Sequence, residues 1–280
     1  MNTGSVKEGL DLLGQGTVSS QSLDLAWWQV GVAATLILIH ALVSWRMHLG
    51  LGRKVLWSGF RLVVQLTLLG LVLHQIFALS HFAPVLGLGL VMTVIAGLSA
   101  VDRVSLRYDG IRWTAIFAVW VSSWFTTGIA VLLIVQPKPW FSPQVLIPLL
   151  GMVLGNSLTG ISLGMDRLLS DLKGKRDEIE TMLALGATRS EATRELMMGA
   201  TSASMIPILY TMSVAGIVII PGMMNGQLLA GAAPIQAVKY QIMIMFVIAA
   251  AIALGVLISL QLTRRLLTTK SHQIAWDRLR

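Results

Sequence analysis

Residues 166–199 read DRLLSDLKGKRDEIETMLALGATRSEATRELMMG and form the one long polar segment of an otherwise strongly apolar chain. Apolar runs long enough to cross a bilayer lie on both sides of this segment. Its residues are mostly good helix formers, interrupted at Gly186. We therefore predict two short helices that meet at a glycine turn and are held on the inner surface of a membrane.

The turn at Gly186 is predicted by local signals. Ile179 and Leu183 share one face with Gly186 at helical spacing, and glycine suits the left-handed position that ends a helix. Thr188 and Glu191 have the spacing of a capping box, in which each side chain bonds the other residue's backbone amide. One helix is expected to end at Gly186 and another to begin at Thr188. An ordinary cytoplasmic helical hairpin would have the same local pattern.

Composition places the chain in a membrane. Of its 280 residues, 55% are hydrophobic and 12% are charged, whereas soluble domains carry about 25% charged residues. The expected fold class is an all-α integral membrane protein of about seven transmembrane helices with a cytoplasmic coupling helix-turn-helix. There is no cysteine, which excludes disulfides and thiolate sites. Residues 1–25 are polar and lack the features of a cleavable signal peptide.

The placement of lysine and arginine predicts the orientation of the spans. The predicted spans are 26–45, 57–79, 84–101, 113–135, 144–165, 200–220 and 240–262. All but Lys7, Lys138 and Lys239 of the 21 basic residues fall in segments on one side of these spans, which the positive-inside rule makes cytoplasmic. The N-terminus is then outside and the C-terminus inside. The alternative is a re-entrant loop at 220–238.

Three regions follow from these assignments. Residues 1–25 are expected to be an extracytoplasmic polar tail and residues 26–265 a transmembrane permease domain that includes the coupling segment 166–199. Residues 266–280 are expected to be a basic cytoplasmic tail.

Motifs for catalysis are missing from the sequence. Gly174-Lys175 is followed by Arg176 and lacks the upstream glycine of a phosphate-binding loop. Neither a hydrolase triad, nor a zinc motif, nor a pair of carboxylates within the spans is found. We expect no catalytic residues, no enzyme activity and no cofactor on this chain, and the metal-binding residues are unknown. If transport is driven by ATP, the ATPase is a separate subunit.

Polar residues and helix breakers within or near the spans are candidates for a translocation pathway or gate. Polar groups buried in a membrane usually face protein or water. Asn156 is one candidate, with a hydrogen bond between helices as the alternative. The others lie where backbone breakers suggest a cavity or a well-packed outer loop. They are Pro221, Gly222, Met223, Met224, Asn225, Gln227 and Gln241.

Several stretches resemble a known family. Glu180 to Gly186 (ETMLALG) is similar to the EAA-type coupling loop of ABC permeases, although Thr181 and Met182 replace its two alanines. Further stretches resemble the FetB-type (UPF0014) family of bacterial iron-export ABC permeases, related to plant aluminium-tolerance half-transporters. They are 147–156 (IPLLGMVLGN), 183–188 (LALGAT), 220–231 (IPGMMNGQLLAG) and 239–243 (KYQIM), and the resemblance is strongest in the last two.

The resemblance implies a function. It implies a permease subunit in the bacterial inner membrane that forms a homodimer and binds cytoplasmic ATPase subunits, which hold the ATP. Surrounding lipid is the other expected partner, and no nucleic acid is expected. The substrate would be iron or another metal. The residues expected to couple to the ATPase are Glu180, Leu185, Gly186, Ala187, Thr188 and Glu191.

Two other functions stay open. A membrane subunit could couple an ATPase to a periplasmic task without moving a solute. A self-powered secondary transporter would show intramembrane acids or broken-helix repeats, which are scarce here.

Overall fold

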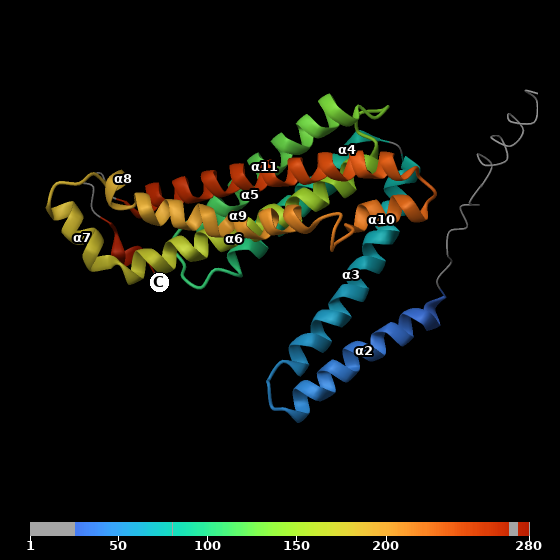
Figure 1. Ribbon diagram of the computed structural model, residues 1–280, viewed down its shortest axis with the longest axis horizontal. Coiled ribbons are helices and arrows are strands. Elements are labelled where there is room, and N and C mark those ends of the chain that lie inside the picture. Colours follow the sequence, from blue (N-terminus) through green and yellow to red (C-terminus); the bar gives the residue numbers. More distant parts are fainter. Residues whose placement is uncertain (1–25, 80, 269–273, 280) are drawn as a thin grey trace, which may run out of the picture. The chain divides into compact units, whose positions relative to one another are not determined.

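The computed structural model describes residues 26–79, 81–268 and 274–279, which form helices joined by short turns (Figure 1). The predicted tail 1–25 and parts of the tail 266–280 lie outside the described residues. Within those ranges, six helices are long and apolar enough to cross a membrane. They are α2 (Trp27–Arg46), α3 (Gly52–Leu79), α4 (Phe82–Val101), α5 (Ile111–Ile129) with its π-helical continuation η1 (Ala130–Val135), α6 (Pro143–Gly174) and α11 (Pro234–Leu267).

The all-α membrane fold is confirmed, while the sixth predicted span differs from its prediction. The expected span 200–220 corresponds to α9 (Arg194–Val214), which is not among the six apolar helices. The helix ends at Val214, where Gly216 adopts a left-handed φ of 80° and its amide bonds the Ile219 carbonyl at 2.9 Å. The chain therefore turns before the predicted end of the span, and Pro221 introduces the short helix α10 (Gly222–Leu229).

Two helices are much longer than the hydropathy pattern predicted. α6 has 32 residues and ends at Gly174, well beyond the expected end at 165. α11 has 34 residues, because it begins before the expected span 240–262 and ends after it. Hydropathy reports the apolar stretch alone, whereas a helix continues into water as long as its backbone hydrogen bonds and side chains allow. The first turns of the polar segment 166–199 are thus an extension of α6.

The described chain forms two compact units. One contains residues 73–219 and 242–280, and the other contains residues up to 72 and residues 220–241. In the first unit, α4, α5, α6 and α9 pack together, with the 242–267 part of α11 alongside them (Figure 1).

Glycines allow the helices of this first unit to approach closely, as small residues do in membrane bundles. A Cβ atom at Gly97 of α4 would lie 2.6 Å from the Ile116 Cα of α5, and one at Gly160 of α6 would lie 2.6 Å from the Ile252 Cγ2 of α11. A Cβ at Gly164 would lie 2.5 Å from the Ser204 Oγ of α9. These glycines face neighbouring helices of the same chain, so they serve folding within the subunit.

Hydrogen bonds join the loop 102–110, which connects α4 to α5, to two other helices of this unit. The Ser105 amide donates to Asp166 Oδ1 at 2.7 Å, which joins this loop to α6. Tyr108 and Thr263 share a hydrogen bond of 2.9 Å between their hydroxyl oxygens, which joins it to α11. Burial raises the pKa of Tyr108. The loop is therefore bonded to the same ends of α6 and α11 from which the polar segment and the C-terminal tail extend.

Candidate functional site

The polar segment beyond α6 forms a compact hairpin of two short helices. α7 (Arg176–Ala184) follows α6 after Lys175, and α8 (Arg189–Ala192) leads through Thr193 into α9. The buried Ile179, only 2% exposed, anchors α7, in agreement with the predicted apolar face. The hairpin is thus attached at both ends to helices of the bundle.

The glycine turn between the two helices has the predicted geometry. Gly186 adopts a left-handed φ of 94°, which other residues rarely tolerate. Its amide bonds the Leu183 carbonyl at 3.1 Å, and the Ala187 amide bonds the Met182 carbonyl at 3.0 Å. These two bonds are the pair that defines a Schellman motif, so α7 ends with its last carbonyls satisfied.

The start of α8 carries the predicted capping box. The Thr188 amide donates to Glu191 Oε2 at 2.8 Å, and the Glu191 amide donates to Thr188 Oγ1 at 3.3 Å. The backbone hydrogen bond from Thr188, helped by its hydroxyl, lowers the pKa of Glu191. A helix of four residues has little stability of its own, so this cap is what defines where it begins.

The tip between α7 and α8 presents an apolar side chain to its surroundings. Leu185 is 83% exposed, although the tip lies in the most polar segment of the sequence. Glu180 is half exposed on α7 and accepts a hydrogen bond from the Arg176 Nε at 2.9 Å. The six residues expected to couple to an ATPase therefore lie together, on the second half of α7, the turn and α8.

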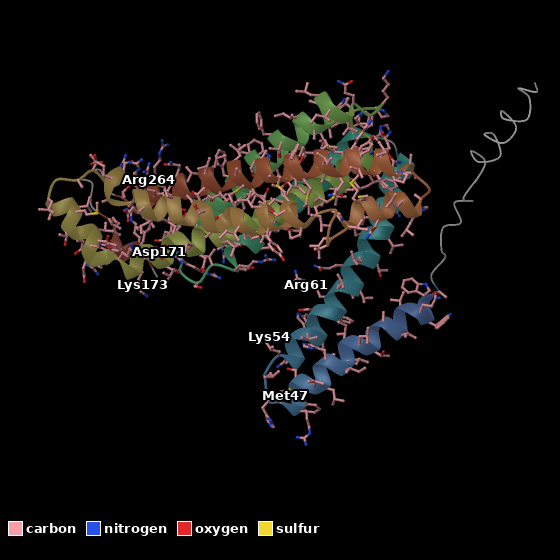
Figure 2. All side chains as sticks on the ribbon, in the orientation of Figure 1. Met47, Lys54, Arg61, Asp171, Lys173 and Arg264 are labelled. Atoms are coloured by element: carbon pink, nitrogen blue, oxygen red, sulfur yellow. The ribbon has the colours of Figure 1, made fainter. Side chains whose placement is uncertain are left out.

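Contacts to the C-terminal part of the chain were not predicted from the sequence. The Arg264 Nη1 donates to Ser190 Oγ at 3.0 Å, and the Arg189 Nη1 lies 3.5 Å from Thr268 Oγ1, so α8 is bonded to the end of α11. The guanidinium of Arg176 lies 5.0 Å from the centre of the Trp276 ring. Figure 2 shows Arg264 at the end of α11, and Asp171 and Lys173 near the end of α6. A lone tryptophan in a basic tail was the only sequence signal for these contacts.

Asn156 lies beside a small cavity of about 80 Å³ in the same unit. Its side-chain amide donates to the Met152 carbonyl of its own helix at 2.8 Å, rather than to a neighbouring helix. The further neighbours of the cavity come from α6 and α9, with Ile252 of α11, and three of them carry hydroxyl groups. The neighbours from α6 and α9 are Thr159, Gly160, Ser204, Pro207, Ile208 and Thr211. A volume of this size can hold a few water molecules.

The other predicted pathway residues belong to the second unit. Pro221 is the N-cap of α10, which carries Gly222, Met223, Met224, Asn225 and Gln227. Eight residues of helix span about 12 Å, too short to cross a bilayer. Gln241, 9% exposed, has a carbonyl oxygen without a hydrogen-bond partner among the described residues, as does Gln227. The residues from Pro221 to Gln227 thus belong to a short helix, and Gln241 lies in the first part of α11.

Among the described residues, no group of three or more His, Asp or Glu side chains is placed to hold a metal ion. The oxygen groups beside Asn156 are an amide and hydroxyls, which are neutral.

Comparison with known proteins gives a consistent result over most of the chain. A family described as "Uncharacterised protein family (UPF0014)" matches residues 27–267. The UPF0014 membrane protein slr1647 of Synechocystis is 38% identical over 81% of this chain and 87% of its own length. The "probable iron export permease protein FetB" of Escherichia coli is 30% identical over 90% of this chain and 95% of its own length.

A plant protein is also similar. The protein ALUMINUM SENSITIVE 3 of Arabidopsis thaliana is 30% identical over 86% of this chain and 87% of its own length. No solved structure matches the chain.

Proposed function

The chain belongs to the UPF0014 family of membrane proteins, and from this premise we propose that it is the permease subunit of an ATP-binding cassette transporter. ATP would be bound and hydrolysed on a separate cytoplasmic subunit. The permease would lie in a bacterial inner membrane, with its N-terminus outside and its C-terminus inside, and would work as a homodimer. Its substrate would be iron or another metal, in line with the printed name of the Escherichia coli relative.

The observation that carries the proposal is the hairpin α7–Gly186–α8. A coupling element must be rigid, must protrude, and must be attached to helices that line the path. The Schellman turn and the capping box make the hairpin rigid. Leu185 is the exposed apolar contact that a partner could bury, and Glu180 is a half-exposed polar contact on α7.

The attachments of the hairpin support a mechanical role. α6 runs without a break from Pro143 past Asn156 to Gly174, and α9 starts two residues after α8. α6 and α9 pack closely at Gly164 and Ser204. A displacement of the hairpin would therefore move both helices that line the cavity at Asn156. The hydrogen bond from Arg264 to Ser190 extends this path to α11.

The coupling proposal is tested by capture of the ATPase. The chain is extracted gently from its native membrane, and the proteins that accompany it are identified. An ATP-binding subunit at roughly equal amounts, lost from a variant with Gly186→Trp and Glu180→Lys, supports the proposal. Retained binding by that variant, or a chain that purifies alone and still moves solute in vesicles, contradicts it.

The pathway proposal needs a separate test. We expect Asn156→Leu to keep ATPase capture and to reduce metal export, measured as the metal content of cells and the efflux from vesicles. Leu209→Ala, at an exposed position of α9, serves as a control that leaves export unchanged. A loss-of-function variant with normal cellular metal content would contradict the assignment of a metal substrate.

Orientation is testable because the chain has no native cysteine. A cysteine at Lys138 should react with a membrane-impermeant thiol reagent in intact spheroplasts, and one at Lys173 should react only after lysis. The opposite labelling pattern would reverse the proposed topology.

A further inference from the structure

The helices α2 and α3 form a hairpin in which they lie close together at the connecting loop and farther apart away from it. Gly52 lies so close to α2 that a Cβ there would be 3.0 Å from the Ala41 carbonyl oxygen. The Leu49 amide bonds the Ser44 carbonyl at 3.0 Å, and Ala41 and Ser44 are the buried residues of α2. From this closed end the two helices diverge (Figure 1).

The space between the diverging helices is a groove of about 1330 Å³. Its walls are mainly apolar and include Leu38, Leu42, Leu56 and Phe60, with Trp45 and Trp57 toward the loop. A volume above the usual 300–1,000 Å³ of small-molecule sites suits a long, flexible apolar ligand. Tryptophans at one end are typical of the level of the lipid headgroups. The groove thus has the polarity profile of a lipid molecule.

The closed end of the groove is strongly basic. His48, Arg53 and Lys54 line it, and Arg46 lies on the adjoining end of α2. Figure 2 shows Lys54 near the loop and Arg61 farther along α3. The sequence contains no Asp or Glu between Asp24 and Asp102, nor between Glu195 and Asp277. The described part of this unit therefore has no carboxylate side chain of its own to neutralise Arg46, Arg53 and Lys54.

We propose that this groove binds one anionic glycerophospholipid. Its phosphate would be bound by Arg53 and Lys54, and its acyl chains would lie along the leucines and Phe60. Basic pockets between transmembrane helices on the cytoplasmic side bind anionic headgroups in this way. A phosphate supplies the counter-charge that this unit lacks, and the chains cover apolar walls that the two helices leave apart.

A second copy of the chain fits the groove less well than a lipid. In a two-fold symmetric dimer built on this groove, the same patch of both copies meets, and that patch carries the cations Arg53 and Lys54 and no carboxylate. Without an anion between them, these like charges repel.

The test is lipid retention by the full-length protein. The protein is reconstituted with equal amounts of phosphatidylglycerol and phosphatidylcholine and then analysed intact by mass spectrometry. The variant carries Arg53→Gln and Lys54→Gln. The control variant carries Lys138→Gln and Lys239→Gln, which removes the same charge at positions outside the groove. Arg53→Lys keeps the charge and should keep the lipid, and thermal unfolding confirms that each variant is folded.

We expect the native protein to retain phosphatidylglycerol in preference to phosphatidylcholine. Since each basic side chain contributes about five-fold, the groove variant should lose about 25-fold in this preference, while the control variant and Arg53→Lys keep it. Equal retention of the two lipids by the native protein overturns the proposal, because the groove would then select chains alone. An equal loss of the phosphatidylglycerol preference in the groove and control variants also overturns the proposal, because the electrostatic field of the whole protein would then cause that preference. A dimer without bound lipid, unchanged in the groove variant, would identify the second copy as the occupant.

Discussion

At the start of α8, the Thr188 amide donates a hydrogen bond to Glu191 Oε2 at 2.8 Å, and the Glu191 amide donates one to Thr188 Oγ1 at 3.3 Å. This reciprocal pair sits one residue after the turn formed by Gly186 and Ala187. The end of α7 is therefore determined by hydrogen bonds between backbone groups, and the start of α8 by hydrogen bonds between backbone and side chains, all between residues at most five positions apart. The rigidity of the proposed coupling element rests on these local bonds, which makes it open to direct test.

Removing the cap should loosen α8. Thr188→Ala removes the acceptor of the Glu191 amide and should cost about 1 kcal/mol of local stability. Hydrogen exchange of the amides of Arg189 to Thr193 should become about five-fold faster. Thr188→Ser, which keeps the hydroxyl, is the control that should exchange like the native protein. Unchanged exchange in Thr188→Ala would show that other contacts hold α8.

The same cap should depend on pH. The hydrogen bonds from Thr188 lower the pKa of Glu191 below its ordinary value of 4.5, so the folded hairpin binds this proton less readily than the unfolded one. Their contribution is thus fully present above about pH 4.5 and is lost as the pH falls through the lowered pKa. Exchange of the α8 amides, corrected for its intrinsic pH dependence, should rise in that range. Glu191→Gln should remove this acid-dependent rise.

Gly186 should tolerate few substitutions, although no atom would touch a Cβ atom there. Its φ of 94° is the reason, since an L-residue in the left-handed region is destabilised by about 1 kcal/mol. Gly186→Ala should speed amide exchange in residues 183–188 and weaken capture of the ATPase. Gly186→Asn should be milder because asparagine tolerates this conformation. Gly199→Ala in α9, which has open space and a helical backbone, is the control expected to leave both measurements unchanged.

Gly97 should be required for the packing of α4 on α5. A Cβ there would lie 2.6 Å from the Ile116 Cα, and backbone cannot move aside as a flexible side chain can. Gly97→Ala should therefore destabilise the protein by about 1–3 kcal/mol, seen as a lower Tm in detergent. Gly87→Ala lies in the same helix with nothing within 4 Å and should leave Tm unchanged or slightly raised. Equal effects of the two variants would contradict the packing of α4 and α5 described above.

Trp276 should hold the C-terminal tail on α7. Its ring lies 5.0 Å from the Arg176 guanidinium, a cation–π contact worth about 0.5–1 kcal/mol at an exposed site. A double-mutant cycle with Arg176→Gln and Trp276→Leu, read out by amide exchange in residues 274–279, should give a coupling of that size. The matched cycle of Arg176→Gln with Trp113→Leu should give additive effects. Additivity in the first cycle would mean that the contact contributes nothing to the position of the tail.

The sequence predicted the local features of this protein well. The membrane class followed from composition, because a bilayer admits long apolar helices whose backbone bonds are internal. The turn at Gly186 and the cap of Thr188 by Glu191 followed from spacing, because each involves residues within five positions of one another. Helix ends in apolar surroundings were less accurate, as at Val214 and Gly174, because hydropathy marks the membrane and not the end of a helix.

Other features were decided by the tertiary structure alone. Which glycines meet a neighbouring helix depends on how the helices are rotated, and Gly97 and Gly87 look alike in the sequence while their surroundings differ completely. The bond from Arg264 to Ser190 joins residues 74 positions apart, and the stacking of Trp276 on Arg176 joins two segments with no shared pattern. Such contacts arise only when packing brings distant helix ends together, so the attachment of the hairpin to α11 could not be predicted from local spacing.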